Sequence, residues 1–134
     1  MSRRIAITLG DPGGIGPDIC VMMAKSSITR NHIFITDPKL LLDSSKKLKI
    51  KIKINLLKTV TSKTVSGLGL INVYPLKLIS KNKPGYMDPK NAPFVIDAIQ
   101  TAAEGCMRGN FDAMVTGPIS KSCLLYTSDA ADDL

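Results

Sequence analysis

Two segments of the sequence combine residue types that can bind a charged ligand. The first, residues 10–17, reads Gly-Asp-Pro-Gly-Gly-Ile-Gly-Pro and follows a run of apolar residues. Glycine lets a ligand approach the backbone closely, and the start of a helix after such a turn favours an anion. The segment is neither a Walker loop nor a Gly-x-Gly-x-x-Gly fingerprint. It therefore indicates either an anion site or a tight strand-to-helix turn that holds no ligand.

The second segment, residues 115–121, reads Val-Thr-Gly-Pro-Ile-Ser-Lys and also follows an apolar run. The hydroxyl groups of Thr116 and Ser120 and the ammonium group of Lys121 are suited to binding a phosphorylated substrate. The alternative is a surface loop without a ligand. Because ligands of open α/β sheets bind beyond the carboxyl ends of the strands, both segments are expected at the edge where such ligands bind.

The remaining reactive side chains form no recognisable site. His32 is the only histidine in the sequence, and a lone histidine cannot build a zinc site, so we assign it a structural role. The three cysteines, Cys20, Cys106 and Cys123, are widely spaced and typical of reduced thiols. We expect Cys20 and Cys106 to be small buried residues. The carboxylates show no spacing typical of metal ligands.

Alternating strands and helices must position the two segments. Asp37 and Pro38 predict a helix start, Asn91 is expected to cap the longest helix, and Gly109 to end it. Pro84-Gly85 predicts a turn within a polar loop at residues 80–90. Strands are predicted at residues 4–9, 33–36, 49–56, 70–74 and 111–116, and helices after Pro17, after Asp37 and after Asn91. This order predicts an α/β fold with a largely parallel sheet.

The composition is that of a globular chain with a basic charge. The 134 residues include 18 Lys and Arg against 11 Asp and Glu, a net charge of +7, with 44% hydrophobic residues. Lysine dominates the basic residues and there is no Trp, which argues against a nucleic-acid partner. The densest basic stretch, residues 46–54, alternates Lys with apolar residues and predicts a half-buried edge strand with its lysines in solvent.

The sequence also argues against a membrane partner. No run approaches the roughly 18 apolar residues that a membrane span requires. The apolar stretch near the N-terminus is too short for a signal peptide. We therefore expect a cytoplasmic protein.

Three ordered segments together resemble the PdxA family, the 4-hydroxythreonine-4-phosphate dehydrogenases of pyridoxine and pyridoxal phosphate biosynthesis. They are residues 7–18 (ITLGDPGGIGPD), 91–95 (NAPFV) and 106–121 (CMRGNFDAMVTGPISK). The first also resembles the Gly-Asp-Gly-Ile-Gly-Pro opening of isocitrate and isopropylmalate dehydrogenases. The resemblance covers residues 1–122. It implies a partial, truncated isocitrate/isopropylmalate dehydrogenase-like α/β fold, mostly a parallel sheet with flanking helices.

The resemblance implies an oxidoreductase that uses NAD or NADP to oxidise 4-phosphohydroxy-L-threonine to 2-amino-3-oxo-4-phosphooxybutanoate, which then decarboxylates. A divalent metal (Zn, Mg or Co) assists, and the family acts as a homodimer. Its three metal-binding histidines and its Gly-His-Thr-Glu motif are missing from this sequence, so it implies no catalytic or metal residue here and predicts an inactive chain. It implies substrate-lining roles for Thr116, Gly117 and Lys121, and Ser120 departs from the His or Asn of many members. Cofactor-binding residues stay unassigned.

The last residues depart from the family. Residues 123–134, CLLYTSDAADDL, resemble the translation of a transposase sequencing adapter, so we expect a native segment at 1–122 and an artefactual tail at 123–134. Because later elements of the family would cover the strand at 111–116, we expect exposed apolar surface there and marginal stability. The alternative function is a stand-alone phosphate- or nucleotide-binding α/β module without catalysis.

Overall fold

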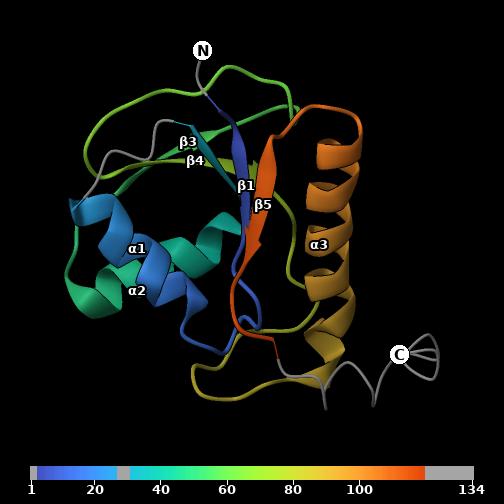
Figure 1. Ribbon diagram of the computed structural model, residues 1–134. Helices are drawn as coiled ribbons and strands as arrows, with labels where there is room; N and C mark the ends of the chain where they lie inside the picture. The colour runs from blue at the N-terminus through green and yellow to red at the C-terminus, as the bar shows by residue number, and fades with distance from the viewer. Residues whose placement is uncertain (1–2, 27–30, 120–134) are drawn as a thin grey trace.

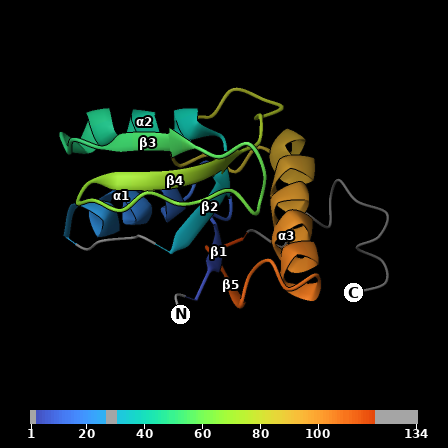
Figure 2. The same cartoon turned by 90° about the horizontal axis from the view of Figure 1, so that it is seen from above.

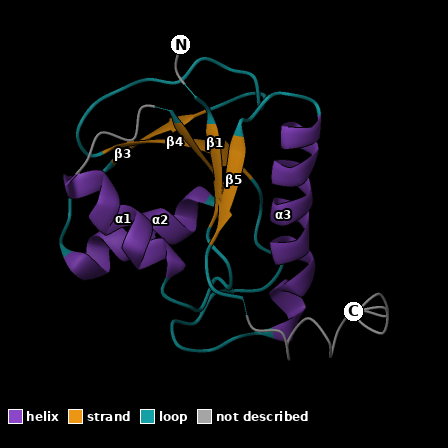
Figure 3. Cartoon of the chain, in the orientation of Figure 1, coloured by secondary structure: helices purple, strands orange, loops and turns teal. Residues whose placement is uncertain are grey.

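The structure is a computed structural model and describes residues 3–26 and 31–119. It contains the five strands and three helices that the sequence predicts, in the predicted order (Figures 1 and 3). These are β1 (Ile5–Thr8), α1 (Gly16–Ser26), β2 (His32–Thr36), α2 (Pro38–Leu48), β3 (Lys53–Leu56), β4 (Leu70–Pro75), the short 3-10 helix η1 (Pro89–Asn91), α3 (Ala92–Met107) and β5 (Ala113–Thr116).

The strands form one sheet in the order β3-β4-β2-β1-β5, and every pairing is parallel. Helices α1 and α2 cover one face and α3 covers the other (Figures 1 and 2). Phe34 points into the cluster that contains α1 and α2 residues, whereas Ile33 and Ile35 point into the cluster beneath α3. Because both faces of the sheet are covered, its central strands are continuous apolar runs. The predicted fold class is confirmed.

The lysine-rich stretch at residues 46–54 is only partly a strand. Helix α2 continues to Leu48 and ends at Lys49, which adopts the left-handed conformation with φ 56°. Strand β3 then begins at Lys53 and is an edge strand, as predicted. Across the stretch the lysines are exposed and the isoleucines are half-buried, so the predicted alternation of exposure holds although the predicted strand start at residue 49 was wrong.

Of the two predicted helix caps, Asp37 is confirmed and Asn91 is wrong. Asp37 caps α2, because its Oδ1 accepts the backbone N–H of Lys39 at 3.0 Å. Asn91 occupies the position before α3 but makes no capping hydrogen bond. Its side chain instead accepts the N–H of Ser80 at 2.8 Å and donates to the Ser80 carbonyl at 3.2 Å. Asn91 therefore closes a loop and does not cap a helix.

The edge opposite β3 is formed by β5, which pairs only with β1 in the part of the chain that the structure describes. Val115 of β5 is 54% exposed and lies beside an apolar groove of about 380 Å³ between the sheet and α1. The groove is lined by Ile5, Ile7, Ile19 and Met23 among others. The exposed apolar surface expected at this strand is thus present. None of the helices in the described ranges is long and apolar enough to cross a membrane.

Candidate functional site

The two segments singled out from the sequence meet at the carboxyl edge of the sheet. The Gly117 N–H donates to the Thr8 carbonyl at 2.8 Å, and the Asp11 N–H donates to the Pro118 carbonyl at 3.0 Å. Gly10 has φ +77°, and a Cβ on it would overlap the carbonyl of Pro118. The ends of β1 and β5 are therefore packed backbone against backbone.

A third segment, the loop at residues 80–91, joins them there. The Gly85 N–H donates to the Gly13 carbonyl at 2.8 Å, and a Cβ on Gly13 would overlap the Tyr86 carbonyl. Figure 1 shows this olive loop beside the blue turn after β1, below the sheet. The sequence predicts only a Pro84-Gly85 turn in this loop, because nothing local to it indicates a partner some 70 residues earlier.

These contacts explain the glycines of residues 10–17. Gly10 and Gly13 each face a carbonyl group of another loop, and a Cβ on Gly16 would overlap the carbonyl of Leu9. The missing side chains therefore leave room for protein backbone, a close approach that glycine permits. Of the two interpretations of this segment, the tight turn accounts for the structure without a ligand.

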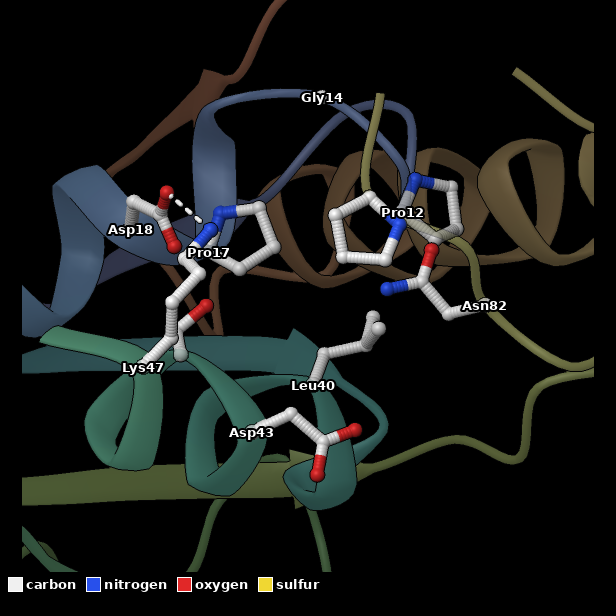
Figure 4. Close-up of a pocket in the computed structure, with 10 residues that line it drawn as sticks. Pro12, Gly14, Pro17, Asp18, Leu40, Asp43, Lys47 and Asn82 are labelled. Carbon is white, nitrogen blue, oxygen red and sulfur yellow. Dashed lines mark hydrogen bonds and ion pairs between the residues drawn. The ribbon is translucent and has the colours of Figure 1, made fainter. Parts of the chain in front are cut away.

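The start of α1 is already occupied by charged groups of the protein. Asp18 in its first turn accepts a hydrogen bond from the Lys47 ammonium group at 2.7 Å (Figure 4). Burial raises the pKa of Asp18, but hydrogen bonds from Lys47 and Ser44 outweigh burial and lower it. A carboxylate at this position stabilises the positive end of the helix dipole. An anionic ligand at the start of α1 would therefore have to compete with the Asp18 carboxylate for the Lys47 ammonium group and for the positive end of the helix.

Beside this ion pair lies a small cavity of about 130 Å³ between the turn at residues 12–17, α2 and the 80–91 loop. Figure 4 shows Asp18 and Asp43 on its walls together with Lys47 and Asn82. Two carboxylates and one ammonium group leave the cavity walls with excess negative charge, which does not suit a phosphate.

The predicted site residues lie at the rim of this edge. Thr116 is exposed at the end of β5, and Gly117 is half-buried against the Leu9 carbonyl. Thr116 is in register with Thr8, whose buried hydroxyl lacks a partner among the described residues. Lys121, Ser120 and Cys123 lie outside the described residues. The structure thus brings Thr116 and Gly117 next to the start of the glycine-rich turn.

The histidine and the two described cysteines differ in burial. His32 begins β2, is half-buried, and packs edge-on to Phe34 with 6.5 Å between ring centroids. Cys20 is buried, and burial raises the pKa of its thiol to about 12. Cys106 is only half-buried, against expectation, because it lies near the end of α3. In residues 3–26 and 31–119, no three His, Cys, Asp or Glu side chains are grouped closely enough to hold a metal ion.

Comparison with known proteins identifies the family. The family described as "Pyridoxal phosphate biosynthetic protein PdxA" matches residues 28–129. The 4-hydroxythreonine-4-phosphate dehydrogenase of Thioalkalivibrio sulfidiphilus is 35% identical over 121 residues, which are 90% of this chain and 37% of that protein. The enzyme of the same name from Saccharophagus degradans is 38% identical over 120 residues, 90% of this chain and 36% of that protein.

Solved structures agree in fold. The 4-hydroxythreonine-4-phosphate dehydrogenase of Klebsiella pneumoniae superimposes with a TM-score of 0.87 at 21% identity, covering 96% of this chain and 41% of that one. The corresponding Burkholderia phymatum protein has a TM-score of 0.81 at 25% identity, covering 92% and 38%. The chain spans less than two fifths of the length of the two curated relatives above. Over most of its own length, this chain belongs to the PdxA family.

Proposed function

We propose that this chain is part of a 4-hydroxythreonine-4-phosphate dehydrogenase that acts in pyridoxal phosphate biosynthesis. The observation that carries the proposal is the family match over residues 28–129, together with longer relatives that bear this name. The reaction is the oxidation of 4-phosphohydroxy-L-threonine by NAD or NADP. The secondary alcohol loses a hydride to the nicotinamide and a proton from its hydroxyl group, and the resulting 3-keto acid then loses carbon dioxide.

The described residues contribute to this reaction by shaping the substrate end of the site. We assign Thr116 and Gly117 to the substrate-binding wall because they lie at the carboxyl edge of a parallel sheet, where ligands of such sheets bind. Lys121 follows them in the sequence and is included in the same proposal. The exposed Thr116 hydroxyl can hydrogen-bond a phosphate or hydroxyl group of the substrate.

A divalent metal (Zn, Mg or Co), when bound, lowers the pKa of the substrate alcohol and polarises the developing ketone. The described residues do not fit such a metal, because no three ligand-type side chains are grouped among them. We therefore assign no step of the metal chemistry to this part of the protein. The proposal further includes a homodimer in the cytoplasm, a native segment at residues 1–122, and a non-native tail at residues 123–134.

The test starts from the source DNA. Amplification across the codons for residues 119–134 shows whether the tail is encoded there, and a contiguous tail would contradict its proposed origin. The complete reading frame is then expressed, and formation of reduced nicotinamide is followed with 4-phosphohydroxy-L-threonine, NAD or NADP, and a divalent metal.

We expect metal-dependent oxidation by the product of the complete reading frame and none by the 134-residue chain. A long product that binds the substrate but never reduces the cofactor would refute the proposed reaction. Oxidation by the 134-residue chain alone would refute its predicted inactivity.

A further inference from the structure

A groove of about 680 Å³ lies between the start of α2 and the segment at residues 77–82. Three lysines line it, Lys39 on α2 and Lys77 and Lys81 on the segment after β4. All three are exposed, and within residues 3–26 and 31–119 none of their ammonium groups forms an ion pair or a hydrogen bond. The groove has the volume of a small-molecule site, which is about 300–1,000 Å³.

The groove lies where two neighbouring strands lead to opposite faces of the sheet. Strands β2 and β4 pair directly with each other. The chain leaves β2 for α2 on one face, and it leaves β4 through η1 for α3 on the other face (Figures 1 and 2). In open α/β sheets, ligands bind outside the carboxyl ends of the strands at such a switch point. The walls of the groove come from the two segments that diverge there, residues 37–43 and 77–82.

Hydrogen bonds hold the two walls of the groove together. The Leu76 N–H donates to the Thr36 carbonyl at 3.0 Å, and the Leu78 N–H donates to Asp37 Oδ2 at 2.9 Å. The other carboxylate oxygen of Asp37 accepts the backbone N–H of Lys39. Asp37 therefore fixes the start of α2 against the segment after β4. A groove that is formed before its ligand arrives loses less conformational entropy when the ligand binds.

The charge on the walls favours an anion. The lining contains three ammonium groups and two carboxylates, those of Asp37 and Asp43. Because both Asp37 oxygens already accept backbone N–H groups, Asp43 is the carboxylate that competes with a ligand for the lysines. The net charge of the chain, +7, adds to the positive potential of a groove lined in this way. Ammonium groups without partners are suited to binding phosphate oxygens.

We propose that this groove binds the phosphate groups of a small ligand about the size of a nucleoside diphosphate, through Lys39, Lys77 and Lys81. Ile79 lines the same groove and is 61% exposed, so it offers apolar surface to the uncharged part of the ligand. A lone phosphate ion would fill little of the groove. The inference does not rest on the proposed function, because it requires neither that substrate nor its oxidation.

The test titrates the nitrogen-15-labelled 134-residue chain separately with adenosine 5′-diphosphate, adenosine and inorganic phosphate. We expect the diphosphate to bind about tenfold more tightly than either of the other two, because only it combines two phosphate groups with an apolar ring. Its binding should shift the amide signals of residues 37–43 and 77–82. Absence of binding by a well-dispersed chain would overturn the proposal, and so would equal affinity for the diphosphate and for either of the other probes.

Paired variants separate the groove from the net charge of the chain. Lys77→Ala combined with Lys81→Ala should weaken binding of the diphosphate about tenfold, because charge-assisted hydrogen bonds are lost. The matched control combines Lys51→Ala with Lys63→Ala, which removes two exposed lysines outside the groove and should change binding less than about twofold. Asp43→Asn should tighten binding, because it removes the competing carboxylate. Equal weakening by the two lysine pairs, or weaker binding by Asp43→Asn, would overturn the proposal.

The product of the complete reading frame provides a second measurement if the 134-residue chain gives no dispersed spectrum. The same variants are made in that product, and binding of the diphosphate is measured by calorimetry. Binding that does not change with Lys77 and Lys81 would overturn the proposal there. Oxidation of 4-phosphohydroxy-L-threonine tests the proposed function separately, so either one can fail while the other stands.

Discussion

Replacement of Gly117 by alanine tests how tightly the ends of β1 and β5 are packed. A Cβ on Gly117 would overlap the Leu9 carbonyl group and lie 3.2 Å from the Gly10 nitrogen. Both neighbours are backbone atoms, so no side chain can rotate away to make room. The two strand ends must separate, which breaks the hydrogen bond from the Gly117 N–H to the Thr8 carbonyl. The neighbouring hydrogen bond, from the Asp11 N–H to the Pro118 carbonyl, is expected to break with it.

The expected cost follows from these contacts. Each of the two backbone hydrogen bonds contributes about 1 kcal/mol, and overpacking adds about 1–3 kcal/mol. Gly117→Ala should therefore lower the free energy of unfolding by about 3–5 kcal/mol. Such a loss is a large part of the total stability of a small domain.

Two other glycines provide graded controls. A Cβ on Gly67 would lie 3.6 Å from the Leu70 Cβ, an ordinary contact, so Gly67→Ala should be nearly neutral. Gly109 has φ +79° and no atom within 4 Å of its added Cβ, so Gly109→Ala tests backbone strain without overlap. Its expected cost is about 1 kcal/mol.

The assay is urea unfolding of the three variants and the parent chain, followed by far-ultraviolet circular dichroism. From most to least stable, the expected order is Gly67→Ala, Gly109→Ala, Gly117→Ala. A Gly117→Ala chain that is already unfolded without urea would also agree with the expected loss. If Gly117→Ala unfolds within 1 kcal/mol of Gly67→Ala, the inferred backbone packing is wrong. If the parent chain shows a cooperative transition of ordinary stability, the expectation of marginal stability is also wrong.

Three further predictions concern the rest of the molecule. Asn72→Ala should cost about 2–4 kcal/mol in urea unfolding, because the fully buried Asn72 amide both accepts from and donates to the Val65 backbone; a cost below 1 kcal/mol would contradict this. Cys20 should resist alkylation at neutral pH in peptide mapping while the half-buried Cys106 reacts faster, and equal rates would show that α1 opens readily. The pKa of Asp18 is lowered in the folded chain, so the stability from its ion pair is complete above its ordinary value of 3.8 and is lost as the pH falls below it. Asp18→Asn should reduce the loss of unfolding free energy at acid pH by less than about 1 kcal/mol, because the pair is partly exposed. An unchanged pH dependence of the unfolding free energy would count against the ion pair.

The sequence predicted the elements that are governed by local patterns. The apolar runs of β1 and β2 reflect contact with core clusters on both faces of a parallel sheet. Asp37 caps α2 through its near neighbour Lys39. The boundary between α2 and β3 was misplaced. Lysines alternate with apolar residues throughout residues 46–54, and this alternation of exposure holds although the backbone passes from the end of a helix through a loop into a strand. Asn91 was misassigned because its partner, Ser80, lies eleven residues away in a loop.

The site was predictable only in outline. The alternation of strands and helices places the segments after β1 and β5 at the carboxyl edge of the sheet, as expected. That they meet there follows from the pairing of β5 with β1, which the sequence did not predict. Whether a glycine faces a ligand or another backbone cannot be decided from its identity, and here Gly10 and Gly13 face carbonyl groups of other loops. The attachment of Gly85 to Gly13 joins distant parts of the chain and leaves no local pattern.

The two edges of the sheet give this chain an unequal capacity for strand addition. Strand β3 carries the exposed Lys53 and follows the exposed Lys51, and such charges discourage another strand from pairing there. The outer side of β5, from Ala113 to Thr116, has no charge and no proline. A second copy that paired through β5 would present its own lysine-bearing β3 edge outward. Those charges would discourage a third copy from adding there, so strand addition at this sheet favours pairs of chains over fibres.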